Sequence, residues 1–143
     1  MKCSIIIDKN KDEEVLIYSR ENSPTVRRIK EFAESADTEL KGYDDGEIVK
    51  LALPDVFCFI VEDNKIYAIC EKKRYRLKQR MYQLTEMLPE SFVKVNQSCI
   101  VNVEKISRFE ATLGASLNVI LKNGYKDYVS RRCMKDVKER LSL

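Results

Sequence analysis

Histidine is absent from the 143 residues of this chain. Histidine is the commonest general base of enzymes, a frequent zinc ligand, and the partner that activates a nucleophilic cysteine. The sequence also has no nucleophile-elbow motif and no paired carboxylates in a shared motif. These absences exclude the most familiar kinds of catalytic site. We therefore expect that the chain is not an enzyme and that it holds neither a metal ion nor another cofactor.

Long hydrophobic runs are missing too. No stretch approaches the roughly 18 consecutive apolar residues that suggest a membrane span, and the run Ile5–Ile7 is too short for the core of a signal peptide. The five cysteines include no C-x-x-C pair, and most of them lie in or beside apolar runs, which is typical of reduced thiols in a core. We expect a cytoplasmic protein without a membrane span.

Positive charge is modest in the whole chain but unevenly distributed. The net charge is +3; residues 1–45 carry 8 Lys and Arg against 11 Asp and Glu, whereas residues 46–143 carry 18 against 12. Phosphate binding depends on local basic surface rather than on the charge of the whole chain. The second part of the chain is therefore the candidate for binding nucleic acid, although a solvated lysine-rich surface would give the same balance.

The first part of the chain predicts a small β-β-α unit. Residues 2–7 and 15–18 are short apolar runs that predict two strands. Ser23 followed by a proline is typical of a helix start, and apolar residues recur at helical spacing as far as Ala36. A unit of this size cannot bury enough surface to fold alone. We expect residues 1–38 to pack on a second copy, which would make a homodimer, or on the rest of the same chain.

Residues 39–143 have a different pattern, and we place the domain boundary in the Gly- and Asp-rich stretch before Glu47. Short apolar runs separated by Gly, Asn and Asp predict strands through most of this part, with helices only at 77–88 and 130–141. The predicted fold class is therefore α+β and mainly β. The densest basic run, 72–80, would lie partly on the first of these helices, either as a strip that faces phosphates or as solvated surface.

A polar break interrupts the apolar stretch Phe92–Asn102. Asn96, Gln97 and Ser98 lie between two strand-forming runs. Amide side chains held on such a turn can bond adenine through two hydrogen bonds. Asn and Ser are also ordinary turn formers, so the break alone fits a plain turn as well as a binding site.

A second turn signal follows. Asn123 and the glycine after it lie between Val119–Leu121 and Tyr125–Val129, which is a strong pattern for a β-hairpin. The second strand runs directly into Ser130 and two arginines, and a short amphipathic pattern comes next. Ser130 is suited to cap the helix expected there.

The order of these features resembles the LytTR family of bacterial transcription regulators. They are the run from Phe92 that ends in Ser-x-Ile-Val-Asn, then Ile106, the Asn-Gly hairpin and Val-Ser-Arg-Arg, and the resemblance extends from Glu47 to Leu143. It implies a multi-sheet β domain with short helices that binds double-stranded DNA by placing loops, not a recognition helix, in the major groove. Because the N-terminal unit is too short for a phospho-receiver domain, we expect a regulator without one.

The resemblance also implies roles for individual residues. Contacts to bases fall on Asn96, Gln97, Arg132 and Lys65, and contacts to phosphates fall on Ser98, Lys94 and Arg131. Asn102 is expected to fix a backbone turn. Two alternatives stay open: Arg132 could pair with Asp136 on the last helix, and the chain could be a protein-interaction module without direct DNA readout.

Overall fold

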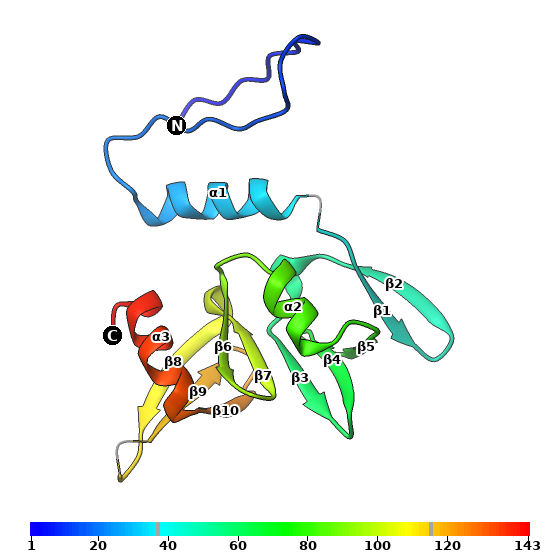
Figure 1. Cartoon of the computed structure of the whole chain (residues 1–143), viewed down its shortest axis with the longest axis vertical. Coiled ribbons are helices and arrows are strands. Elements are labelled where there is room, and N and C mark those ends of the chain that lie inside the picture. Colours follow the sequence, from blue (N-terminus) through cyan, green and yellow to red (C-terminus); the bar gives the residue numbers. More distant parts are fainter. Residues whose placement is uncertain (37, 115) are drawn as a thin grey trace.

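Ten strands and three α-helices make up the fold in the computed structural model, which describes residues 1–36, 38–114 and 116–143 (Figure 1). The larger antiparallel sheet contains β1 (Leu40–Asp44), β2 (Glu47–Leu51), β3 (Cys58–Glu62), β4 (Lys65–Ile69), β5 (Arg74–Leu77), β6 (Phe92–Asn96) and β7 (Cys99–Asn102). The smaller sheet contains β8 (Ile106–Ala111), β9 (Leu117–Leu121) and β10 (Lys126–Val129). The helices are α1 (Pro24–Ser35), α2 (Met81–Met87) and α3 (Arg131–Leu141).

The strand order is β2-β1-β5-β4-β3-β7-β6 in the larger sheet and β10-β9-β8 in the smaller one. The prediction of a mainly β fold with short helices is confirmed. The Asn-Gly hairpin is confirmed as well: β9 and β10 pair in antiparallel fashion, and Gly124 has a φ of 90°, which glycine adopts without steric cost. No helix in the described residues is long and apolar enough to span a membrane.

The two faces of the larger sheet pack against different elements, because side chains alternate between faces along each strand. One face carries a core cluster that includes Phe59 and is joined by Leu84 of α2. The opposite face carries a second cluster, in which Ile60 packs with Val119 of the smaller sheet and Val137 of α3. The central strands are therefore held between two layers, and the turns at their ends have a rigid base.

The second helix is shorter than the sequence pattern predicts. We expected a helix over 77–88, but α2 covers only Met81–Met87, because Leu77 ends the strand β5. Leu77 pairs with Ile66 of β4 and is 3% exposed. A leucine fills the buried face of a strand as well as the apolar stripe of a helix, so its four-residue spacing to Met81 was misleading. The basic run at 72–80 consequently lies on a strand and a loop.

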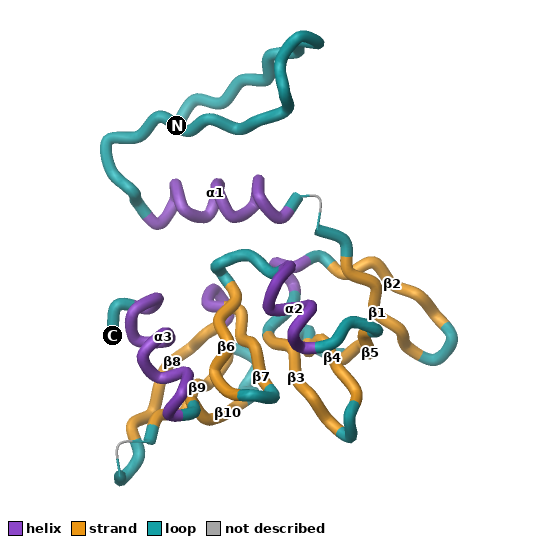
Figure 2. The backbone as a smooth tube through the Cα atoms, viewed as in Figure 1, coloured by secondary structure: helices purple, strands orange, loops and turns teal. Residues whose placement is uncertain are grey.

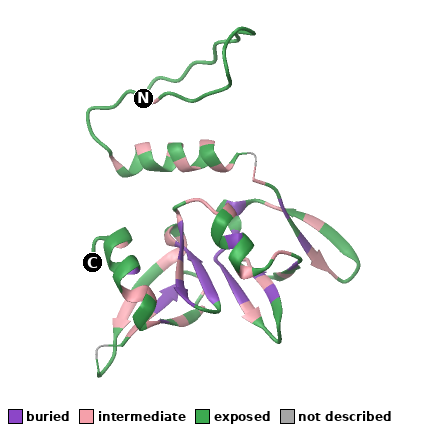
Figure 3. Cartoon of the chain, in the orientation of Figure 1, coloured by how far each residue is buried: buried purple, intermediate pink, exposed green. Residues whose placement is uncertain are grey.

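The two strands predicted in the first part of the chain do not form. Residues 1–22 have no regular secondary structure and lead as a loop to α1, which begins at Pro24 as predicted (Figure 2). The side chains of Ile5, Ile6 and Ile7 are 84% to 87% exposed. An isolated pair of strands is marginal in water unless it packs on a further layer, and this segment and α1 contribute no buried residue (Figure 3).

Gly42 of β1 lies where a side chain does not fit. A Cβ atom at this position would stand 2.5 Å from the Cβ of Tyr75 on the neighbouring strand β5. We expect Gly42→Ala to push β1 away from β5 and to lower the free energy of unfolding by about 1–3 kcal/mol. Chemical denaturation of both proteins measures the difference. Unfolding at the same denaturant concentration as the wild type would show that β1 does not pack this closely.

Candidate nucleic-acid interface

Three segments that are distant in the sequence meet at one edge of the molecule. The β3–β4 turn, the β6–β7 turn and the start of α3 lie along the lower edge in Figure 1. Two backbone hydrogen bonds connect these parts: the Val61 amide donates to the Ser98 carbonyl over 3.0 Å, and the Ser130 amide donates to the Val95 carbonyl over 2.8 Å. We call this edge the loop edge. The prediction that the polar break forms a turn between two strands is confirmed.

Gln97 and Ser98 form the exposed tip of the β6–β7 turn. Lys94, three residues earlier on β6, is half-buried, and its Nζ donates a hydrogen bond to Gln97 Oε1 over 3.4 Å. This distance is longer than that of a strong hydrogen bond. The contact can therefore be exchanged for a contact to a ligand at little cost, and both side chains stay usable at the surface.

Asn96, in contrast, lies inside the protein and is 1% exposed. Its Nδ2 donates to Asp127 Oδ1 and to the Tyr128 carbonyl, each over 2.9 Å, and its Oδ1 accepts from the Ser98 amide over 2.8 Å. Both amide protons are thus in use, and the side chain is shielded from solvent, so it does not reach a base edge as it stands. We assign Asn96 a positioning role in place of the predicted base contact: it ties the β6–β7 turn to β10.

Asp127 and Tyr125 complete this support, and no pattern in the sequence pointed to either residue. Asp127 accepts from Asn96 through Oδ1 and from the Tyr125 hydroxyl through Oδ2, the latter over 3.2 Å. Burial, more than any other cause, raises the pKa of the Tyr125 hydroxyl, so this group stays neutral and remains a donor. The turn that carries Gln97 is therefore braced from the smaller sheet.

Arg131 and Arg132 are the first two residues of α3, and both are exposed. Ser130 caps the helix as predicted, because its side chain accepts a hydrogen bond from a backbone amide one turn further along, over 3.3 Å. The Ser130 amide is itself bound to β6. The start of α3, and with it the backbone of both arginines, is therefore fixed relative to the β6–β7 turn.

The alternative in which Arg132 pairs with Asp136 is wrong. Asp136 Oδ1 accepts instead from Arg140 Nε, over 3.1 Å and one helical turn away. Within residues 1–36, 38–114 and 116–143, Arg132 makes no ion pair. Its guanidinium group can thus meet a ligand without first breaking such a contact.

Lys65 and Asn102 have different surroundings. Lys65 is the first residue of β4 and is exposed directly after the β3–β4 turn, at the loop edge. Asn102 is buried, its Nδ2 donates to the Val56 carbonyl over 2.9 Å, and its Oδ1 accepts from the Glu104 amide over 3.0 Å. The prediction that Asn102 fixes the backbone is confirmed.

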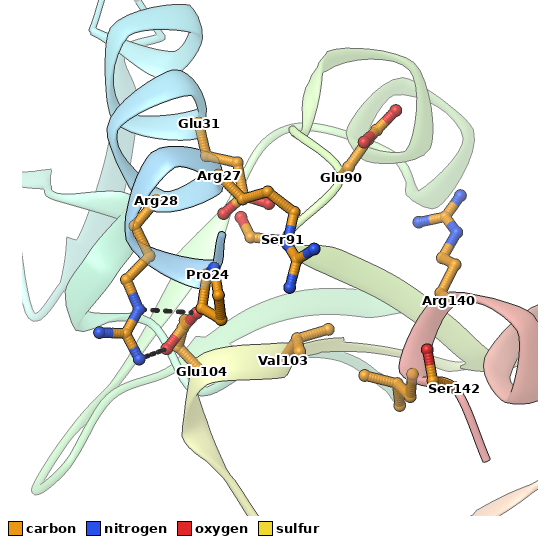
Figure 4. A pocket seen from close by; sticks show the side chains of 11 residues that line it. Pro24, Arg27, Arg28, Glu31, Glu90, Ser91, Val103, Glu104, Arg140 and Ser142 are labelled. Carbon is orange, nitrogen blue, oxygen red and sulfur yellow. Dashed lines mark hydrogen bonds and ion pairs between the residues drawn. The ribbon is translucent and has the colours of Figure 1, made fainter. Parts of the chain in front are cut away.

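A hollow separates α1 from the β domain, and Figure 4 shows its lining from close by. Arg28 of α1 pairs there with Glu104, over 3.3 Å between Nη2 and Oε2. Both groups are well exposed, so the pair contributes at most about 1 kcal/mol. Partial burial, followed by the charge of Glu104, raises the pKa of the Glu31 carboxyl. Three arginines and three glutamates line the hollow, so it has no excess charge that would favour phosphate.

The chain is similar to several known proteins. Two relatives from Staphylococcus aureus, strains NCTC 8325 / PS 47 and MRSA252, carry the name of an uncharacterised HTH-type transcriptional regulator. Each is 32% identical over 146 residues, which cover 100% of this chain and 99% of the relative. A solved LytTr DNA-binding domain from Bacillus cereus superposes with a TM-score of 0.69 at 20% identity, covering 73% of this chain and 97% of the domain. This structural similarity supports the fold described above.

The word HTH in the relatives' name does not describe the helices seen here. Strands lie between α1 and α2 and between α2 and α3, so these three helices do not form a helix-turn-helix unit. The model of the LytTr DNA-binding domain family matches residues 46–142, which is more than half of the chain. The resemblance found in the sequence is thereby confirmed, and the chain belongs to the LytTr DNA-binding domain family.

Proposed function

We propose that this protein is a transcription regulator that recognises a specific sequence in double-stranded DNA with its loop edge. The observation that carries the proposal is that exposed Lys65, Gln97 and Arg132 share this edge on segments tied together through the backbone. Side chains on rigid elements keep the geometry that base recognition needs. Amide and guanidinium groups are also the ones that bond adenine and guanine edges in the major groove.

The start of α3 supports a contact to an anion. A helix N-terminus disfavours nearby cations by about 0.3–1 kcal/mol each, yet α3 begins with Arg131 and Arg132 and has no acidic residue in its first turn. A DNA phosphate at this position would compensate both charges and the helix dipole. We therefore assign Arg131 to a phosphate, together with Ser98 and Lys94, and Arg132 to a base.

We infer that turns, rather than a recognition helix, enter the major groove. α2 packs on the larger sheet through Leu84, and α3 packs on the core through Val137. Of the helices that the structure describes, α3 reaches the loop edge, and it does so with its first turn (Figure 1). We also propose that the regulator works in the cytoplasm without a phospho-receiver domain. The sheets described are antiparallel, whereas receiver domains have a parallel sheet with helices on both faces.

We further propose that the segment ending in α1 joins two copies of the chain into a homodimer. Several of its large apolar side chains lie exposed on their own chain: Phe32 of α1 is 69% exposed, and Ile5, Ile6 and Ile7 are 84% to 87% exposed. α1 meets its own β domain at a hollow where charged groups predominate, so the same-chain contact leaves these side chains in water. Two linked domains would bind two half-sites and gain affinity through effective concentration.

This proposal predicts a dimer that a single charge disrupts. The full chain should sediment as a dimer at concentrations of roughly tens of micromolar, the range in which avidity matters, and Phe32→Asp should shift it to a monomer. Phe32→Asp should also weaken binding to a duplex with two half-sites while leaving binding to a single half-site unchanged. Lys30→Asp, about 200° around the same helix, is the matched control. A monomeric wild-type chain at these concentrations would contradict the proposal.

Selection of bound duplexes from a random pool tests the DNA-binding proposal itself. We expect one recurring sequence, bound more tightly than random duplexes and less tightly as salt increases. Retention of random and selected duplexes with equal affinity would contradict sequence recognition. No retention of any duplex at low salt would favour the alternative, a protein-interaction module without direct DNA readout.

A further inference from the structure

One face of the larger sheet is open to solvent over β4, β5 and β1. Strand pairing places Arg76 of β5 between Tyr67 of β4 and Tyr43 of β1. Tyr67 pairs in turn with Ile60 of β3. Residues directly opposite each other in paired strands share a face. Ile60 belongs to the core that this sheet shares with the smaller one. The open region is therefore the part of the same face that the smaller sheet does not cover.

Basic side chains gather on this open face. Arg74, Arg76 and Lys78 are two residues apart along β5 and its end, and a period of two puts them on the same side. Arg74 is engaged within the protein, because it pairs with Glu62 and its guanidinium carbon lies 4.3 Å from the centre of the Tyr67 ring. Among the residues that the structure describes, Arg76 and Lys78 make no ion pair. Lys78 Nζ lies 4.7 Å from the centre of the Tyr43 ring, which leaves its charge without a carboxylate partner.

The open face is continuous with the loop edge. Lys65, Arg76, Lys78 and Arg80 line one hollow, and no carboxylate lines it in the described part of the chain. Lys65 is the residue that follows the β3–β4 turn, and it lies two positions before Tyr67 on the same face. A duplex held at the loop edge would therefore meet this cationic hollow next.

We propose that Arg76 and Lys78 bind the phosphate backbone of the DNA beside the bases that the loop edge reads. The inference rests on the proposed function and extends its binding surface across the sheet face. Lysine and arginine contacts to phosphate contribute affinity and orientation without sequence preference, and they release counterions from the DNA. Lys65 would lie between the residues that contact bases and the residues that contact phosphates, because it belongs to the loop edge and also lines the hollow. Phosphate is the ligand favoured here because four cations surround one hollow, which no carboxylate of the described residues lines.

The double variant Arg76→Ala/Lys78→Ala tests this contact on the full-length protein. Dissociation constants are measured for the selected duplex and for a random duplex across a salt series. We expect the variant to bind both duplexes more weakly by the same factor, and the slope of log K against log salt to lose about 2 units. Between 50 and 200 mM salt, affinity should then fall roughly tenfold less than it does for the wild type.

Two control variants distinguish a direct contact of these two side chains with phosphate from a general effect of the protein's net charge. Lys9→Ala/Lys11→Ala removes the same charge from the exposed N-terminal segment and should leave the salt slope unchanged. Arg76→Lys/Lys78→Arg keeps both charges and should bind close to the wild type. Thermal unfolding of every variant confirms that each is folded at the assay temperature.

An unchanged salt slope in the double alanine variant would overturn the proposal, as would a loss confined to the selected duplex. Arg132→Ala keeps this outcome separate from a failure of the proposed function. If Arg132→Ala loses the selected duplex while the double variant behaves like the wild type, the loop edge reads DNA and the sheet face does not touch it. If the wild type binds no duplex, the DNA-binding proposal itself fails.

Discussion

Arg132→Ala is expected to weaken binding of the selected duplex by roughly 5- to 150-fold, because a bidentate contact to guanine contributes about 1–3 kcal/mol of discrimination. The guanidinium group has no ion pair to lose within the described residues, and its backbone is fixed by the capped start of α3. Random duplexes should lose far less affinity, and the melting temperature of the protein should stay nearly constant. Equilibrium binding to duplexes that vary one base pair at a time measures the effect and locates the base.

Arg131→Ala provides the matched control, since it removes the same charge from the adjacent residue. We assign Arg131 to a phosphate, so its loss should weaken selected and random duplexes equally and reduce the salt slope by about 1. An equal loss on both duplexes for Arg132→Ala as well would make Arg132 a phosphate contact, and its assignment to a base would be withdrawn. No loss for either arginine would place the DNA elsewhere on the protein.

Asn96→Ala is expected to lower the free energy of unfolding by about 2–4 kcal/mol, because it removes three hydrogen bonds of a buried side chain, each of which contributes about 0.5–1.5 kcal/mol. The Ser98 amide and the Tyr128 carbonyl lose their bonds to the side chain, and Asp127 loses one donor. For a chain of this size, the melting temperature should drop by roughly 6–16 °C. DNA binding should weaken too, since the turn that carries Gln97 loses its brace.

Gln97→Ala is the contrasting variant one residue further along. Gln97 is exposed and bonded only weakly by Lys94, so its removal should leave the melting temperature unchanged while weakening the selected duplex more than random ones. Melting curves and binding curves for the two variants together therefore distinguish a residue that supports the turn from a residue that contacts DNA. An Asn96→Ala protein that melts like the wild type but no longer recognises its sequence would restore Asn96 as a base contact.

The comparison of positions 96 and 97 shows a limit of sequence patterns in β structure. Val93 and Val95 are buried on β6, so regular alternation would turn Asn96 outward. The pairing of β6 with β7 instead shifts register between Lys94 and Asn96. Such a bulge adds one residue to one strand and exchanges the faces of those that follow. The sequence around the bulge contains no signal for it, and the partner Asp127 lies 31 residues away.

The basic run at 72–80 illustrates a different limit. Leu77 fits the helical spacing of Met81 and Leu84, and only its pairing with Ile66 assigns it to a strand. The alternation of Arg74, Arg76 and Lys78 with apolar or aromatic residues is a period-two pattern that could have revealed the strand. The helical spacing of Leu77, Met81 and Leu84 extends over more residues and therefore favoured a helix. Short segments of this kind are decided by the neighbours they meet, which local spacing does not specify.

By itself, the sequence determined the features that depend on a few adjacent residues. Ser23 and Ser130 cap α1 and α3, and the Asn123-Gly124 turn joins β9 to β10, because caps and tight turns are set by local backbone preference. Only the tertiary structure decided which polar side chains face outward. Asn96 is buried and Arg76 is exposed, and residues 2–7 and 15–18 have no strand partners among the described residues. Strand formation and burial require partners far along the chain, and a sequence pattern shows the need for a partner without showing where that partner is.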